Sequence, residues 1–173
     1  MKCTYSILSL FLLVGVSVGC HSNLPKDLPP LYPCTISVTQ DGVPLERAVV
    51  ALQYAEGAAP AEGQLWFPRG VTDANGEAVL KANSLYPGAP IGHFKIIVTK
   101  FVPGESKYGP PPPEDDPRYS GWVQKVSGEI PPVFGIIEKQ YTEAETTPHE
   151  IEIKKGKNSA SIDVGKPTRY LVL

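Results

Sequence analysis

The stretch Gly70-Val71-Thr72-Asp73-Ala74-Asn75-Gly76-Glu77-Ala78-Val79-Leu80 combines a turn signal with the beginning of a strand. Asp73 to Gly76 holds residues typical of a tight turn, because Asp and Asn side chains bond nearby backbone groups and Gly accepts a positive φ. After the turn, Ala78 and Leu80 occupy alternate positions, as in a strand with one buried face. The stretch therefore predicts a turn that feeds a strand into a sheet.

Other short segments with alternating or β-branched residues predict the remaining strands: 34–39, 48–54, 65–67, 93–101, 149–153 and 159–164. Asp41-Gly42 predicts a hairpin after the first of these strands. Inward-facing positions in this pattern are Cys34, Ile36, Val38, Phe94, Ile96 and Val98. No segment of the mature chain shows the periodicity of an amphipathic helix of ten residues, so we predict an all-β fold of two antiparallel sheets packed face to face.

The N-terminus has the pattern of an export signal. Met1-Lys2 is followed by an apolar run from Ile7 to Val18, which is shorter than the roughly 20 residues that span a bilayer. Ser17-Val18-Gly19-Cys20 resembles the lipobox of bacterial lipoproteins, with Ser17 where that pattern usually has Leu. This resemblance implies a signal peptide at 1–19, lipidation of Cys20 and anchoring to the membrane. The alternative is an ordinary cleaved signal followed by an incidental cysteine.

The cysteine count agrees with this interpretation. Cys3 would leave with the signal and Cys20 would carry lipid, so the mature domain keeps only Cys34. One cysteine forms no intramolecular disulfide, and the sequence places no base near Cys34 that would activate it as a nucleophile. We expect Cys34 to be a small apolar side chain of a strand.

The rest of the chain divides into a spacer and one domain. Residues 20–33 are rich in proline and predict an extended tether, and residues 34–173 are long enough for a single β-sandwich domain. The formal net charge is −2 with both signs interspersed, so no basic stripe indicates nucleic acid. The 19 prolines and 16 glycines suit many short strands joined by turns.

A long proline-rich insertion, residues 102–148, precedes the last two strands. Insertions of this length are commonly functional or disordered. Its aromatic residues lie among prolines and form a possible binding surface for a sugar or a partner protein: Tyr108, Tyr119, Trp122 and Tyr141. The alternative is that these rings hold the insertion against the sandwich.

The order of these motifs resembles a carboxypeptidase-regulatory-like domain. The resemblance rests on the Asp41-Gly42 hairpin, Pro44-Leu45, the alternation from Ala48 to Leu52, the Thr72–Ala78 turn and the strand from Gly92. It covers roughly residues 31–166 apart from the middle of the insertion, and implies a seven-stranded immunoglobulin-like or transthyretin-like sandwich. The tail, from Tyr141 through Thr147-Pro148 to Gly156 and Asn158, resembles small lipoproteins abundant in planctomycete bacteria.

Catalysis and metal binding have weak signals in this sequence. Transthyretin-like folds include a hydrolase of 5-hydroxyisourate, but the ending Thr168-Arg169-Tyr170 does not match the Tyr-Arg-Gly-Ser ending of that enzyme. His93 and His149 have no zinc-ligand spacing, and the Asp73 turn resembles half a calcium loop without its final acidic ligand. The acidic run Glu114-Asp115-Asp116 is expected to be solvated. We therefore expect no enzyme, no cofactor and no metal.

These observations lead to one main functional hypothesis and two alternatives. The main hypothesis is a non-catalytic, lipid-anchored module at the cell envelope, on the periplasmic side or the cell surface, with a binding or structural role. The first alternative is a carbohydrate-binding accessory domain that uses the aromatic residues of the insertion. The second is an envelope hydrolase. Expected partners are the membrane, through the lipid anchor, and an envelope protein or glycan.

Overall fold

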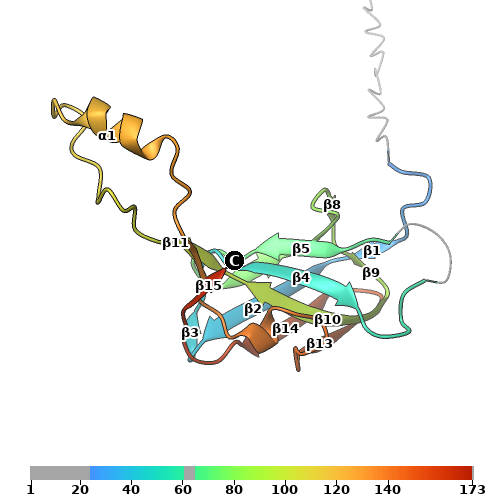
Figure 1. The fold of residues 1–173 in the computed structure, drawn as a ribbon. Coiled ribbons are helices and arrows are strands. Elements are labelled where there is room, and N and C mark those ends of the chain that lie inside the picture. The colour runs from blue at the N-terminus through green and yellow to red at the C-terminus, as the bar shows by residue number, and fades with distance from the viewer. Residues whose placement is uncertain (1–23, 61–64, 173) are drawn as a thin grey trace, which may run out of the picture.

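The computed structural model describes residues 24–60 and 65–172, which are mostly β structure in several sheets (Figure 1). The larger main sheet has the strand order β13 (Glu150–Ile153), β10 (Gly92–Thr99), β4 (Val49–Tyr54), β5 (Pro68–Val71), β7 (Lys81–Ala82) and β8 (Tyr86–Pro87). The second main sheet contains β14 (Asn158–Asp163), β2 (Cys34–Gln40) and β3 (Val43–Pro44), and β6 (Glu77–Val79) also pairs with β2. Cys20, the expected lipidation site, lies outside the described residues.

Two small sheets and two short helices complete the described part. One sheet pairs β1 (Leu31–Tyr32) with β9 (Ala89–Pro90), and the other has the order β11 (Phe101–Pro103), β12 (Val133–Gly135) and β15 (Tyr170–Val172). The helices are α1 (Tyr119–Val126) and the 3₁₀ turn η1 (Lys139–Tyr141). Among residues 24–60 and 65–172, no helix has the length and apolar character needed to cross a membrane.

The predicted alternation of inward residues is confirmed, and it builds the core between the two main sheets. Ile36 and Val38 of β2 are fully buried, as are Phe94, Ile96 and Val98 of β10. The intervening side chains of these strands are only partly buried. In a strand, every second side chain points inward. Each large inward side chain that is removed from water contributes roughly 1.5–3 kcal/mol of hydrophobic stabilisation.

The turn at Asp73 forms as predicted. Its carboxylate accepts hydrogen bonds from the backbone N–H groups of Asn75 (2.8 Å) and Glu77 (2.9 Å). Gly76 has φ +76°, and a Cβ at this position would clash with the carbonyl oxygen of Val38. The following residues, Ala78 and Leu80, are fully buried. Glycine is therefore required by both the backbone angle and the close approach of β2.

Thr72 explains how the same turn is attached to the neighbouring loop. Its buried hydroxyl accepts a hydrogen bond from the Ala48 N–H (2.8 Å) and donates one to the Leu45 carbonyl (2.5 Å). The predicted Asp41-Gly42 hairpin also forms, with β2 and β3 paired antiparallel and positive φ at both turn residues.

The prediction of purely antiparallel sheets is wrong for one pair. β14 runs parallel to β2 over its whole length, from Asn158 opposite Cys34 to Asp163 opposite Thr39. The reversal around Gly156 does not return β14 beside β13, because β13 pairs with β10 in the larger sheet. The chain instead crosses from one sheet to the other, and a parallel neighbour for β2 results.

The predicted strand at Leu65–Phe67 is also wrong. The strand begins at Pro68, and only Trp66 of the apolar trio is buried. Phe67 bonds to Asn83 instead, donating from its N–H to the side-chain oxygen (3.0 Å) and accepting from the Asn83 N–H (3.1 Å). A side chain and a turn thus supply the backbone partners that a strand neighbour supplies elsewhere.

Three segments expected to lack strands contain them. Leu31–Tyr32, inside the expected tether, pairs with Ala89–Pro90, for which no strand was predicted. The insertion 102–148 contributes β12 and part of β11, and both belong to the same small sheet as β15. Within the insertion, residues 104–132 project from the sandwich between β11 and β12 (Figure 1).

Candidate functional site

Residues 104–132 form a projection that we call the arm. Its two limbs leave the sandwich at the ends of β11 and β12, where the Gly104 N–H donates to the Pro132 carbonyl (2.6 Å). Figure 1 shows the arm extending from the end of the sandwich opposite the described N-terminal residues. The small sheet thus serves as a fixed base that sets the direction of the arm.

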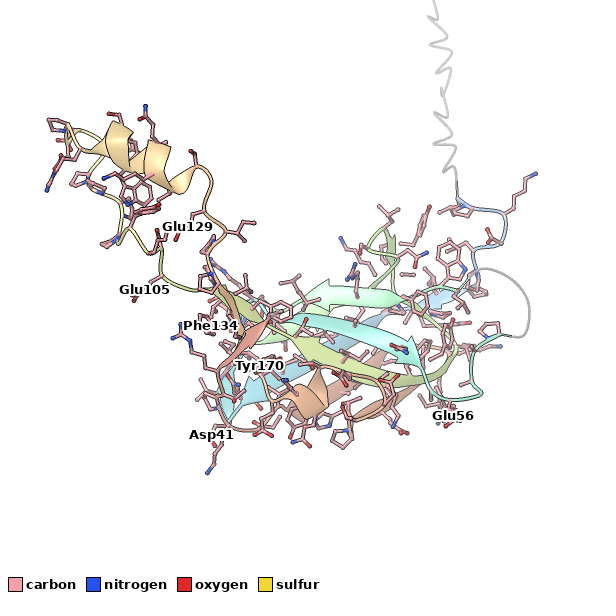
Figure 2. The ribbon with its side chains drawn as sticks, in the orientation of Figure 1. Asp41, Glu56, Glu105, Glu129, Phe134 and Tyr170 are labelled. Atoms are coloured by element: carbon pink, nitrogen blue, oxygen red, sulfur yellow. The ribbon has the colours of Figure 1, made fainter. Side chains whose placement is uncertain are left out.

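Glu129 holds the two limbs together just above this base. Its carboxylate accepts hydrogen bonds from the Ser106 hydroxyl and from the Lys107 N–H (2.9 Å). These bonds, with that of Ser106 first in importance, keep the pKa of Glu129 below its ordinary value. Figure 2 shows Glu129 and Glu105 on opposite limbs. Of these two carboxylates, Glu129 makes the bond between the limbs.

Helix α1 lies in the outer part of the arm. Just before it, the Asp116 carboxylate binds the guanidinium of Arg118 through its two oxygens, with a shortest distance of 2.6 Å. This contact lowers the pKa of Asp116 and raises that of Arg118. At the other end, the Ser127 N–H bonds to the Val123 carbonyl (3.0 Å). Both ends of this two-turn helix therefore have local hydrogen bonds.

The apolar residues of α1 share one side of the helix: Tyr119, Trp122, Val123 and Val126. This spacing of i, i+3, i+4 and i+7 is typical of a helix that packs on one face. None of these residues is buried by the sandwich. Their neighbours are instead in the arm itself, since the Trp122 indole N–H donates to the Gly109 carbonyl (3.3 Å) across to the other limb.

A groove of about 350 Å³ opens where the helix meets the proline-rich limb. We call it the arm groove, and it is lined by Tyr108, Pro112, Arg118, Gly121, Trp122 and Lys125. The rings of Tyr119 and Trp122 lie nearly parallel, with centroids 6.4 Å apart and planes inclined by 22°. The groove offers rigid apolar area from rings and proline together with two cationic side chains, a combination that can bind a ligand.

The structure brings three of the four predicted aromatic residues together and separates the fourth. Tyr108 and Trp122 line the arm groove, and Tyr119 stacks on Trp122. Tyr141 follows the arm in sequence but packs against the core of the sandwich, with its ring stacked on His149 at 5.4 Å. The two interpretations of these rings thus apply to different residues: Tyr141 packs on the sandwich, and the other three belong to the arm.

His149 has a structural environment. Its Nε2 donates to the Asp163 carbonyl (3.0 Å) and its ring is held under Tyr141. Burial, followed by the charges of Glu138 and Asp163, raises the pKa of Tyr141. One imidazole nitrogen is therefore already bonded to a backbone carbonyl that accepts but does not exchange a proton.

The remaining candidate residues are also accounted for by their surroundings. Cys34 is buried in the core, and this burial raises its thiol pKa to about 11. His93 is exposed beside Glu152, with 3.5 Å between Nε2 and the carboxylate. Within residues 24–60 and 65–172, no three His, Cys, Asp or Glu side chains gather closely enough to hold a metal ion. The Asp73 carboxylate is occupied by the backbone of its own turn.

Sequence reasoning missed several residues of the arm. Pro112, Arg118 and Lys125 line the groove, and Glu129 fixes its limbs. The i, i+3, i+4, i+7 spacing from Tyr119 to Val126 was a usable signal for the helix, although eight residues are few for a confident periodicity. Comparison with protein-family models, with curated proteins and with solved structures gave no match.

Proposed function

We propose that this protein is a non-catalytic, lipid-anchored binding module of the cell envelope, and that the arm groove is its recognition site. The observation that carries the proposal is the groove itself. Tyr108, Pro112 and Trp122 lie together on the arm. Hydrogen bonds join the two limbs of the arm, and the arm projects away from the sandwich. Rigid aromatic side chains supply contact area at low cost in conformational entropy.

The position of the arm supports this role. Lipid on Cys20 would attach the protein through the N-terminal side of the chain, and the described chain enters the sandwich near β1, at the opposite end from the arm (Figure 1). Two or more acyl chains, each contributing roughly 0.8 kcal/mol per buried methylene, give stable anchoring. A module held at one end and presenting a groove at the other is suited to bridging the membrane and a second envelope component.

The proposed fold family is the carboxypeptidase-regulatory-like group, with its immunoglobulin-like or transthyretin-like sandwich. The supporting observations are the Asp41-Gly42 hairpin, the Asp73 turn that leads into β6, and the alternating core residues of β2 and β10. The parallel pairing of β14 with β2 and the strands contributed by the insertion are features to be accommodated within that topology.

One observation favours a glycan as the partner. The nearly parallel rings of Tyr119 and Trp122 form a platform of the kind on which sugar rings stack. Lys125, which lines the groove, provides a donor for sugar hydroxyl or acidic groups. Carbohydrate binding is therefore the alternative function that the arm supports.

A glycan array probed with the full-length protein in detergent distinguishes these alternatives. Saturable binding to a glycan that is lost in Trp122→Ala and kept in Phe101→Ala selects carbohydrate recognition. Phe101 is a matched control, because it is a half-exposed aromatic residue at the base of the arm and not in the groove. Turnover of an envelope substrate that disappears in His149→Ala contradicts the non-catalytic assignment.

Lipidation has its own test. Radiolabelled palmitate should be incorporated into the protein in cells and should be absent from Cys20→Ser. If the unmodified sequence incorporates no label, the lipid anchor is wrong, whatever the arm binds.

A further inference from the structure

We propose a second binding site, for an acidic polysaccharide, on the outer face of the larger main sheet. The site centres on Arg69 of β5 and Lys81 of β7, which are directly opposite each other in the antiparallel register. Both side chains are exposed, and among residues 24–60 and 65–172 neither takes part in an ion pair. Like charges held opposite each other across two strands repel, so this arrangement costs stability that a bound anion recovers.

Two shallow depressions meet at Arg69, and Lys81 lines one of them. One, of about 490 Å³, is lined by Ala51, Leu52, Gln53, Phe67, Pro68, Arg69, Asn83, Ser84 and Ile97. The other, of about 470 Å³, is lined by Val49, Arg69, Gly70, Val71, Val79, Lys81 and Ser84. Because Arg69 and Ser84 belong to both, the two depressions form one continuous groove, which we call the sheet groove.

The floor of the sheet groove is apolar and results from the strand register. Ala51 lies between Ile97 and Arg69 on neighbouring strands, and Val49 is opposite Val71. Val71 and Val79 are 60% and 63% exposed, so this part of the floor is open to solvent. Gly70 lets β6 approach, since a Cβ there would lie 2.8 Å from the Val79 carbonyl oxygen. Aliphatic surface of this kind suits the C–H faces of sugar rings.

The charge of the sheet groove selects an anion. Among the described residues, no Asp or Glu lines either depression, although the whole chain has a formal net charge of −2. A neighbouring depression of the same sheet differs, because Glu56 and Glu145 line it together with Lys95 (Glu56 is labelled in Figure 2). Arg69 can bind a carboxylate through two parallel hydrogen bonds, while Lys81 supplies a second cation beside it.

The neutral polar groups favour a polysaccharide over an acidic peptide. Gln53, Asn83 and Ser84 bring amide and hydroxyl groups to the lining of the 490 Å³ depression, and such groups bond to sugar hydroxyls. A peptide that binds a sheet usually adds to an edge through backbone hydrogen bonds. Here β4 and β5 are interior strands whose backbone groups face strands on both sides, so recognition depends on side chains.

The test uses polygalacturonate as the acidic polysaccharide, with neutral dextran and poly-glutamate as comparisons, titrated into the full-length protein in detergent at physiological salt. We expect saturable binding of polygalacturonate, little binding of dextran and weaker binding of poly-glutamate. Arg69→Gln and Lys81→Gln should each weaken polygalacturonate binding by roughly tenfold or more. Lys166→Gln, with the same change of charge outside the groove, should bind as the unmodified protein does.

Thermal unfolding of the same variants separates a binding role from a structural one. Because the two cations repel, Arg69→Gln and Lys81→Gln should unfold at the same temperature as the unmodified protein or at a higher one. Trp122→Ala should keep its affinity for polygalacturonate, because Trp122 lines the arm groove and not the sheet groove. The experiment therefore tests the sheet groove independently of the arm. No binding of polygalacturonate, equal binding of dextran or poly-glutamate, or full binding by folded Arg69→Gln would each overturn the proposal.

Discussion

The ring of Tyr170 lies so close to the backbone of Gly135 that a Cβ at residue 135 would overlap it. The two residues are opposite each other where β12 pairs with β15, and Figure 2 shows Tyr170 beside Phe134 at this point. Lys139 lies over the same ring, with its Nζ 5.2 Å from the centroid. This contact joins the last strand of the described chain to the base of the arm.

Gly135→Ala should therefore destabilise the protein by about 1–3 kcal/mol, because the added methyl group displaces the Tyr170 ring. In a protein that already carries Tyr170→Ala, the change Gly135→Ala should destabilise much less, because the ring that the methyl group displaces is absent. Urea unfolding of the four proteins measures the interaction energy between the two sites. If the stability changes of the two substitutions simply add, the Tyr170 ring does not limit the size of the side chain at residue 135.

Asp163 predicts a specific pH dependence of stability. Its carboxylate accepts bonds from the Thr39 hydroxyl (2.7 Å) and from the N–H groups of Gly42 (2.9 Å) and Gly165 (2.8 Å). These bonds, that of Thr39 foremost, lower its pKa below the ordinary 3.8. The stability they provide is present above the pKa of the unfolded chain and is lost as the pH falls through the lower pKa of the folded protein.

Asp163→Asn should consequently be less stable than the unmodified protein at neutral pH, and the difference should shrink as the pH falls below 3.8. Urea unfolding of both proteins, from neutral pH to below pH 3.8, measures this difference in stability. Other carboxylates with lowered pKa remain in both proteins and so cancel in the difference. A difference that stays constant with pH would contradict the assigned hydrogen bonds.

Cys34 should react with thiol reagents only when the protein opens. Its side chain is 1% exposed and its pKa of about 11 keeps it protonated, whereas the thiolate is the reactive form. Labelling with a maleimide should be slow in buffer and complete in denaturant, with a rate in buffer that follows global unfolding. Rapid labelling of the native protein would place Cys34 outside the core.

The hydrogen bonds of Glu129 predict that this residue holds the two limbs of the arm together. Glu129→Gln weakens the bonds to Ser106 and Lys107, so trypsin should cut the arm at Lys107, Arg118 or Lys125 several times faster. The melting temperature of the sandwich should not change, because the arm lies outside its core. Glu105→Gln, on the opposite limb, is the matched control and should be cut at the original rate. Equal cutting of both variants would show that Glu129 does not join the limbs.

The sequence predicted the core well and the connections poorly, for a physical reason. Ile36, Val38, Phe94 and Ile96 follow from period-two alternation, which depends only on neighbouring residues. The parallel pairing of Asn158 with Cys34 depends on contacts between segments far apart in the chain, which no local pattern encodes. Hydrophobicity alone also misplaced a strand at Leu65–Phe67, where Asn83 supplies the backbone partners.

The candidate site shows the same division. Proline content and aromatic residues indicated the importance of the insertion, and three of the four aromatic residues do meet there. Tyr141 was assigned to the same surface because it belongs to the same proline-rich insertion, but it packs beside His149 on the sandwich. The hydrogen bonds of Glu129 join residues that are more than 20 positions apart in the sequence. A single acidic residue carries no sequence signal of such a contact.

The central claim, that the sandwich is a scaffold and the arm its recognition element, is tested most directly by removing the arm. Gly104 and Pro132 already form a backbone hydrogen bond, so an Asn-Gly turn joining them should close β11 and β12 into a simple hairpin. Binding of the full-length and armless proteins to fragments of the cell envelope is then measured at increasing concentration, with near-ultraviolet circular dichroism as the check of folding. The account predicts that the armless protein folds and binds at least roughly 30-fold more weakly. An armless protein that folds and binds as tightly as the full-length protein would contradict it.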